Sequence, residues 1–342
     1  MSESTVKPNS KRRMRVLLVA LALTFSGVLG WFLWITQMPL TSYAGAPPPL
    51  TSEELQLRDR LSTEVNYLSV NIGDRSFLRP QSLQAASDYL VSCLREQGYT
   101  VVARPYSVAN EKVNNLEASL AGTDDTLGQV IVGAHYDSVA GTVGANDNGT
   151  GVAAVLEIAR LMRQMKPRRT VRFVLFVNEE PPYFQTASMG SRVYAHQLRQ
   201  AEVPISAMLS LETIGFYSDE PRSQDYPPVL NLFYPSKGNF IAFVGNTESR
   251  GLVRESVRGF RESTRFPSEG IAAPGNWLGI GWSDQWSFWQ EGYPGIMVTD
   301  TALFRYHDYH TPSDTVDKVN FDKAARVVEG IDKLVEELAN KP

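Results

Sequence analysis

Two adjacent glutamates lie where an apolar run gives way to two prolines. The stretch "VNEEPPYF", residues 177–184, contains Glu179 and Glu180. Neighbouring side chains of an extended chain point in opposite directions, so one carboxylate can bind a metal ion while the other stays free to move a proton. Two solvated surface carboxylates are the plainer interpretation. The choice depends on which other polar residues follow apolar runs.

A histidine and an aspartate follow another apolar run. In "VIVGAHYDSVAG", His135 and Asp137 are separated by one residue, so an extended backbone would place both side chains on one face. A metal-binding histidine commonly has its second ring nitrogen held by a carboxylate. Taken alone, the pair is more typical of a protein surface.

Three further residues complete the set. Asp147 lies in the glycine-rich "GANDNGTG", Glu212 ends the apolar part of "AMLSLETIGF", and His310 lies in "YHDYHTPSDT". The glycines do not form a nucleotide-binding loop, because no Lys-Ser or Lys-Thr follows them. Together the imidazoles and carboxylates suit zinc, and they are too rich in carboxylate for a closed structural site.

The elements that position these residues alternate between helical and extended patterns. Helical periodicity covers approximately residues 53–71, 81–97, 150–164, 187–200, 249–264 and 321–340. Strand-like runs cover approximately residues 99–106, 115–121, 129–135, 171–178, 206–212 and 294–299. The runs "QVIVGAH", "VRFVLFVN" and "GIMVTD" are almost continuously apolar, as in strands covered by helices on both faces. The pattern predicts an α/β sandwich, whose ligand site lies at the carboxyl ends of its strands.

An ordered set of motifs resembles a known family. The strings "GAHYDS", "GANDNGTG", "NEEP", "LETIGFYSDEP", "WSDQWSFWQEGYPGIMVTDT" and "YHDYHTPSDT" are similar to those of the co-catalytic zinc exopeptidases of clan MH, which include aminopeptidase Y and secreted bacterial aminopeptidases. The resemblance covers residues 80–340 approximately. It implies a three-layer α/β/α sandwich with a mixed, largely parallel central sheet. Relatives include glutamate carboxypeptidases, glutaminyl cyclases and the inactive transferrin receptor.

The resemblance also implies a ligand set for two Zn²⁺ ions. Asp147 would bridge the two ions. His135 and Glu212 would complete the coordination of one ion, and Glu180 and His310 that of the other. A single zinc ion is the alternative.

Two further roles follow from the resemblance. Glu179 would be the general base that takes a proton from the attacking water, and Asp137 would orient the imidazole of His135. In many relatives the peptide bond after the bridging aspartate is cis, so a cis bond is expected between Asp147 and Asn148.

Glu212 departs from the family pattern, because many members have aspartate at this position. The additional methylene changes the reach of the carboxylate. Ligation by Glu212 therefore needs a different rotamer or a retracted backbone, and both one-zinc and two-zinc arrangements stay open.

The motifs predict a zinc-dependent exopeptidase, most simply an aminopeptidase that hydrolyses N-terminal peptide bonds. A single-zinc transferase similar to glutaminyl cyclase and an inactive receptor-like protein are the alternatives. The Trp-rich stretch "NWLGIGWSDQWSFW" fits either the lining of a substrate pocket or ordinary packing. A serine hydrolase has little support, because the chain contains no Gly-x-Ser-x-Gly elbow.

The N-terminal region predicts a membrane anchor. Residues 16–35 are twenty consecutive uncharged residues, long enough for a transmembrane helix. Residues 1–15 contain five lysines and arginines, which favours a basic cytoplasmic tail and a catalytic domain in the periplasm or outside the cell. A cleaved signal peptide is the alternative, although the apolar run is longer than a typical signal core.

The remaining chain divides into a linker and a catalytic domain. Residues 37–52 are uncharged and include "AGAPPPLTS", which predicts an extended Pro-rich linker. Residues 53–342 form the predicted zinc peptidase domain. This domain has a net charge of −8, since 28 of the 33 basic and 36 of the 37 acidic residues follow residue 15. The acidic balance argues against a nucleic-acid partner and leaves the oligomeric state open.

Overall fold

Helix α1 (Ser10–Thr36) is a unit by itself. The structure is a computed structural model that describes residues 10–341, and the compact catalytic unit begins at Met38. The segment Arg13–Thr36 of α1 is long and apolar enough to cross a membrane. A signal sequence near an N-terminus has the same properties, so α1 fits both predictions. Most of the predicted basic tail lies outside the described residues.

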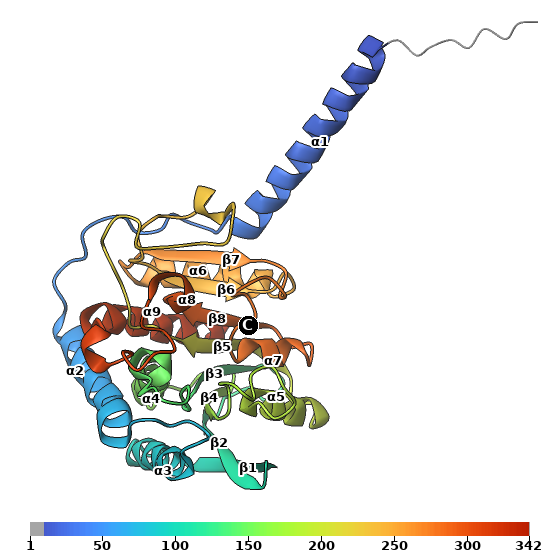
Figure 1. Ribbon diagram of the computed structural model, residues 1–342. Helices are drawn as coiled ribbons and strands as arrows, with labels where there is room; N and C mark the ends of the chain where they lie inside the picture. Colours follow the sequence, from blue (N-terminus) through green and yellow to red (C-terminus); the bar gives the residue numbers. More distant parts are fainter. Residues whose placement is uncertain (1–9, 342) are drawn as a thin grey trace, which may run out of the picture. The chain divides into compact units, whose positions relative to one another are not determined.

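One mixed sheet forms the centre of the catalytic unit. Its strands are β1 (Val101–Val108), β2 (Glu111–Leu120), β3 (Gln129–His135), β4 (Val171–Phe176), β5 (Ile205–Glu212), β6 (Ile241–Gly245), β7 (Ser268–Ala272) and β8 (Gly295–Thr299). Their order is β1-β2-β4-β3-β5-β8-β6-β7, from bottom to top in Figure 1. Strands β4, β3, β5 and β8 run parallel to one another, as do β6 and β7, whereas the other neighbouring pairs are antiparallel.

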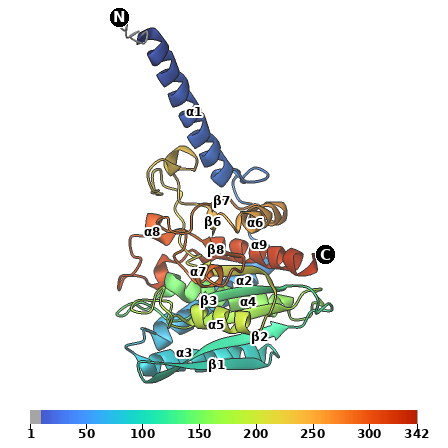
Figure 2. The same ribbon diagram turned by 90° about the vertical axis from the view of Figure 1, so that its right-hand side faces the viewer.

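Helices cover both faces of this sheet. They are α2 (Ser52–Asn66), α3 (Pro80–Glu96), α4 (Gly151–Met162), α5 (Gly190–Gln200), α6 (Arg250–Ser263), α7 (Gln285–Trp289), α8 (Ala302–Arg305) and α9 (Phe321–Asn340). The larger core cluster joins one face of the sheet to α2, α3, α4, α6 and α9, and a smaller cluster joins the other face to α5 and α7. Figures 1 and 2 show α4 and α5 on opposite sides of the sheet. The predicted three-layer sandwich is confirmed.

Alternation along the central strands explains their continuous apolar runs. In β3, Val130 and Val132 belong to the larger core cluster, whereas Ile131 between them belongs to the smaller cluster. All three side chains are fully buried. Because both faces are covered, the period-two pattern of a half-exposed strand disappears from the sequence.

The expected elements agree with the structure apart from the far end of the sheet. The predicted helices and strands are present with ends displaced by a few residues, and the helix expected over 53–71 is α2 followed by a π-helical turn, Tyr67–Ile72. The apolar pattern predicted neither β6 nor β7, which extend the sheet beyond β8. Both strands have only five residues, and the sequence "SEGIA" of β7 mixes polar residues and glycine.

The segment predicted as a linker lies against the catalytic domain. Arg261 of α6 donates hydrogen bonds of 2.9 Å to the carbonyls of Pro39 and Leu40. Arg326 of α9 donates a hydrogen bond to the carbonyl of Pro48. These contacts attach both ends of the segment to helices of the larger core layer.

Candidate metal centre

The carboxyl ends of four neighbouring parallel strands bring the predicted residues together. His135 is the last residue of β3, and Glu212 is the last residue of β5. Glu179 and Glu180 follow β4, and His310 follows β8 and the short helix α8. Because β4, β3, β5 and β8 are adjacent and parallel, these side chains meet at one edge of the sheet.

Asp147 lies between two groups of candidate metal ligands. Its Oδ1 atom is 3.4 Å from Nε2 of His135, which is itself 3.2 Å from Oε2 of Glu212. Its Oδ2 atom is 3.0 Å from Nε2 of His310, which is 3.4 Å from Oε2 of Glu180. The structure thus forms two triads that share Asp147. They have the same membership as the two coordination sets implied by the resemblance.

Glu179 lies beside these triads. Its Oε2 atom is 3.8 Å from Nε2 of His135, and these two residues form a third close group with Glu180. The Glu179 side chain is buried. A carboxylate in this position can exchange a proton with a molecule held between the triads.

The additional methylene of Glu212 does not withdraw its carboxylate from the cluster. Ser283 donates a hydrogen bond of 2.7 Å to Oε2 of Glu212, the same oxygen that approaches His135. Ser283 also contacts the hydroxyl of Ser210 on β5 at 2.9 Å. The serine pair therefore fixes the carboxylate rotamer that brings Glu212 into the first triad.

Hydrogen bonds to the backbone build the turn that presents Asp147. The carboxylate of Asp314 accepts from the amides of Asn146 and Asp147 at 2.8 and 3.0 Å. Gly144 has a left-handed φ of 54°, and a Cβ there would collide with the carbonyl of Asp147. The peptide bond between Asp147 and Asn148 is cis, as the resemblance implies.

Asn148 connects this turn to the end of β5. Its side-chain amide donates a hydrogen bond of 2.8 Å to the carbonyl of Leu211. Its Oδ1 atom accepts from the amides of Thr213 and Gly151 at 3.1 and 3.2 Å. Asn148 therefore couples the position of Asp147 to that of Glu212.

Asp137 contacts the glutamate pair as well as His135. Its two carboxylate oxygens accept from the amides of Glu179 and Glu180 at 3.2 and 3.1 Å. Nδ1 of His135 is 3.2 Å from the carbonyl oxygen of Asp137 and 3.6 Å from its carboxylate. The side chain that was expected to orient the histidine thus fixes the backbone of both glutamates.

Four residues close to the site have left-handed backbone conformations that non-glycine residues rarely adopt. They are Asn178, Thr213, Thr301 and His310, with φ between 44° and 60°. Asn178 directly precedes the glutamate pair, and Thr213 directly follows Glu212. Such conformations cost free energy and are concentrated where function needs a particular side-chain direction.

Arg75 crosses beneath the loops that present the ligands. Its guanidinium is fully buried. It donates hydrogen bonds of 2.7–3.2 Å to five backbone carbonyls, those of Leu68, Gly73, Tyr136, Val143 and Gly144. The last three carbonyls belong to the loop between β3 and Asp147, so one side chain fixes both ends of that loop.

The cluster has more negative charge than its imidazoles can balance. Burial raises the pKa of Glu179, Glu180 and Glu212 above the usual value for a glutamate. Burial opposes the charged form of His135, but nearby carboxylates outweigh burial and raise its pKa well above 6.5. Burial likewise opposes ionisation of Asp147, but contacts with both imidazoles lower its pKa. Bound cations would relieve this imbalance.

The donor atoms fit zinc. Nε2 of His135 and Oε1 of Glu180 are buried and have no hydrogen-bond partner among the described residues. Ligand atoms at roughly 2.0–2.2 Å from a tetrahedral zinc ion are about 3.3–3.6 Å apart, which is close to the 3.0–3.4 Å between imidazole nitrogens and carboxylate oxygens in the two triads. Nitrogen and carboxylate donors are ordinary zinc ligands, and Mg²⁺ or Ca²⁺ would favour oxygen alone.

An α/β sandwich with such a cluster at its strand ends is typical of metal-dependent hydrolases. The sequence comparison narrows this class, because residues 115–335 match the model of peptidase family M28. The chain belongs to this family, a family of zinc metallopeptidases, and the resemblance seen in the motifs is confirmed.

One relative covers almost the whole chain. The uncharacterised protein YfbL of Escherichia coli K12 is 34% identical over 311 residues, which are 88% of this chain and 91% of YfbL. The chain spans only 58% and 42% of the lengths of two further curated relatives.

Solved structures share the fold. The zinc aminopeptidase BSAP from Bacillus subtilis has a TM-score of 0.66 at 15% identity, over 83% of this chain and 95% of that one. A glutaminyl cyclase from Fimbriiglobus ruber has a TM-score of 0.60 at 20% identity, over 86% and 97% of the two chains. Because two activities share this architecture, the fold alone does not distinguish them.

Several residues around the site were not recognised in the sequence. Asp314 and Ser283 lie within the quoted motifs, but neither their residue type nor their distance from other motif residues predicts a role for them. Arg75 precedes the motifs, and no sequence pattern around it indicates its role. Tyr309 stacks on the imidazole of His310, with ring centroids 3.9 Å apart. Its place beside the candidate ligand in the sequence was the one available indication.

Proposed function

We propose that this protein is a zinc-dependent aminopeptidase that hydrolyses N-terminal peptide bonds. The observation that supports the proposal best is Asp147, which turns one carboxylate oxygen toward each histidine of two separate triads. A bridging carboxylate is the group that two neighbouring metal ions require.

The two triads would hold one Zn²⁺ ion each. His135, Asp147 and Glu212 bind the first ion, and Asp147, Glu180 and His310 bind the second. When bound, the ions polarise the scissile carbonyl and lower the pKa of the attacking water. Asp137 holds the glutamate backbone in place throughout.

Glu179 is the proposed general base. It accepts a proton from the attacking water and returns it to the leaving amine, so that the peptide C–N bond breaks and a free amine departs. Its buried position raises the pKa of its carboxyl toward the range in which a carboxylate takes up and releases a proton readily.

The experiment compares aminoacyl 4-nitroanilides before chelation, after chelation and after zinc is added back. We expect release that the chelator abolishes and zinc restores. Glu179→Gln should lower kcat by at least about a hundredfold while zinc content, measured by mass spectrometry, stays unchanged. Glu111→Gln, at an exposed glutamate on β2, is the matched control and should leave kcat unchanged.

Two other outcomes would replace the proposal. Pyroglutamate formation from glutaminyl peptides, with one zinc per chain and no nitroanilide release, would indicate a glutaminyl cyclase. Equal behaviour of the wild type and Glu179→Gln toward every substrate would indicate a receptor-like protein without catalysis.

For the N-terminal unit we propose that α1 anchors the domain in a membrane, with the domain in the periplasm or outside the cell. The five basic residues of the first fifteen support this orientation. The full chain should stay with membranes after carbonate extraction, and protease added outside spheroplasts should degrade the domain. Release of a shortened chain into the soluble fraction would indicate a cleaved signal peptide.

A further inference from the structure

The longer helix α5 and the helix α7 cover only part of one face of the sheet. On the side of α5 and α7, the smaller core cluster contains residues of β3, β4 and β5. The same face of β8, β6 and β7 is covered by the chain between β5 and β6, by the stretch before α7 and by the short helix α8. These segments leave an apolar cavity that is open at its mouth.

Side-chain alternation gives this part of the face an apolar floor. On β6, Ala242 and Val244 line the cavity, whereas Ile241 and Phe243 belong to the larger core on the other face. Met297 of β8 continues the floor. Ala242, Val244 and Met297 keep 5–6% of their surface exposed, but Ile241 and Phe243 keep none. The cavity floor is therefore accessible apolar surface.

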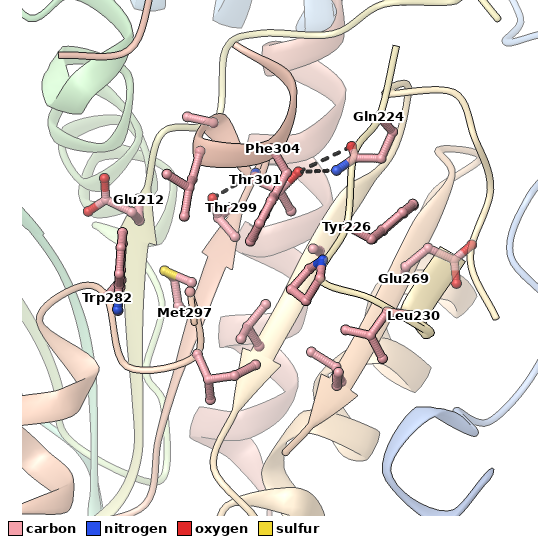
Figure 3. Close-up of a pocket in the computed structure, with 18 of the residues that line it drawn as sticks. Glu212, Gln224, Tyr226, Leu230, Glu269, Trp282, Met297, Thr299, Thr301 and Phe304 are labelled. Carbon is pink, nitrogen blue, oxygen red and sulfur yellow. Dashed lines mark hydrogen bonds between the residues drawn. The ribbon is translucent and has the colours of Figure 1, made fainter. Parts of the chain in front are cut away.

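The cavity is continuous with the metal centre. Glu212 of the metal centre lines the cavity, and so does Tyr309, which stacks on the candidate ligand His310. Figure 3 shows Glu212 and Trp282 at one end and Glu269 at the other, with Met297 and Leu230 between them. A peptide whose first carbonyl lies at the metal centre would have its first side chain at the mouth of this cavity.

The polar side chains deep in the cavity are already bonded within the protein. The amide of Gln224 exchanges hydrogen bonds with the hydroxyl of Thr301, which Figure 3 marks with dashed lines. The hydroxyls of Tyr226 and Tyr234 both donate to backbone carbonyls. These residues therefore present mainly carbon to an occupant.

The one carboxylate at the far end does not provide a site for a cation. Oε2 of Glu269 is 3.6 Å from Nη2 of Arg261, and Figure 3 shows its carboxylate turned away from the other lining side chains. A lysine or arginine side chain in the cavity would lose its hydration without gaining a partner.

We infer that this cavity binds the side chain of the substrate's N-terminal residue and selects large apolar residues such as leucine and phenylalanine. The inference rests on the proposed aminopeptidase function. Burial of a large apolar side chain stabilises the bound state more than burial of a methyl group does, and a charged side chain would stay desolvated and unpaired. We expect differences of tenfold or more between such substrates, as is usual for hydrophobic pockets.

The first experiment measures kcat/KM of the zinc-loaded full chain for nitroanilides of Phe, Leu, Ala, Lys and Glu. We expect Phe and Leu to exceed Lys and Glu by about a hundredfold and Ala by about tenfold. Ala242→Met fills the floor and should lower the Phe-to-Ala ratio about tenfold, with the Ala substrate confirming that the variant is folded. Leu232→Ser, at an exposed residue beside the cavity lining, is the control and should keep the wild-type ratio.

Preference for Lys, Glu or Ala, or an unchanged Phe-to-Ala ratio in Ala242→Met, would overturn the inference and leave the peptidase assignment intact. If no substrate is cleaved, the proposed function fails and binding decides the inference. Calorimetry would then use free L-phenylalanine and L-aspartate as probes. Binding of L-phenylalanine alone, weakened about tenfold in Ala242→Met, would support the inference, and equal or absent binding of both amino acids would overturn it.

Discussion

Ser283 shows how a single hydroxyl determines the position of a candidate ligand. Its hydrogen bond to Oε2 of Glu212 is the contact that fixes the longer side chain at a position where many relatives have aspartate. Groups that orient metal ligands commonly affect metal affinity almost as strongly as the ligands themselves.

We therefore predict that Ser283→Ala weakens zinc binding. The free carboxylate rotamer should lower zinc affinity by about ten- to hundredfold, measured by competition with a chromophoric chelator. Ser287→Ala is a matched control, because Ser287 is equally buried but bonds to Ser191 and not to a ligand. Equal zinc affinities of the two variants would contradict a role of Ser283 in positioning Glu212.

At the scale of single residues, the sequence predicts the residues of the candidate site better than the residues that support them. His135, Glu179 and Glu212 are recognisable because each follows a run that reads as a buried strand. Asp314 and Ser283 are not, because their roles arise only from contacts between loops that folding brings together. A hydroxyl or carboxylate in a loop has the same appearance in sequence whether it bonds to a ligand or to water.

At the scale of elements, Arg75 connects the loop after β3 to the turn that presents Asp147. Arg75→Met should leave several carbonyls without donors and remove a buried positive charge from an acidic region, and it should lower the free energy of unfolding by about 3 kcal/mol or more. Urea denaturation measures this change. Arg79→Met, at a mostly exposed side chain, is the control. Equal stabilities of the two variants would mean that water replaces the guanidinium.

Helix α9 contains a buried carboxyl whose ionisation opposes folding. Burial raises the pKa of Asp332 from 3.8 to about 6. The folded protein thus holds this proton more tightly than the unfolded chain, so the contribution of Asp332 to stability is full below pH 4 and is lost as the pH rises from 4 to 6 approximately.

Asp332→Asn removes this pH dependence, because the amide stays neutral. The variant should match the wild type near pH 4 and exceed its free energy of unfolding by about 2–3 kcal/mol at pH 7, as a shift of roughly two pKa units implies. Urea denaturation across this pH range provides the test, with Glu336→Gln at a more exposed site on α9 as the control. A constant difference between Asp332→Asn and the wild type would contradict the prediction.

Elements were predictable where their apolar pattern was long. The central strands and the amphipathic helices have such patterns, but β6 and β7 are too short for periodicity to identify them. They join the sheet through the pairing of β6 with β8, a strand that follows about fifty residues later in the sequence. The cavity was unpredictable for the same reason, although the Trp-rich stretch does contribute to its lining, through Leu278, Gly279, Ile280 and one tryptophan, Trp282.

For the whole molecule, the acidic cluster predicts that metal binding stabilises the fold. Zinc at a thousand times its dissociation constant adds about 4 kcal/mol when it binds only the folded chain. Differential scanning calorimetry should therefore show a lower Tm after chelation and full recovery with zinc. Magnesium at the same concentration should restore little, because two of the five candidate ligands are imidazoles. An unchanged Tm after verified removal of zinc would contradict this prediction.

The alternation of side chains along β6 has a consequence for how substitutions act on this protein. The residues that shape the cavity, such as Ala242 and Val244, alternate along β6 with Ile241 and Phe243, which hold the larger core together. Mutation can therefore remodel the cavity one residue away from the core without altering the packing under α6 and α9. At adjacent positions of β6, substitutions on the cavity side are therefore expected to change which side chain binds. Substitutions on the core side are expected to change the free energy of unfolding.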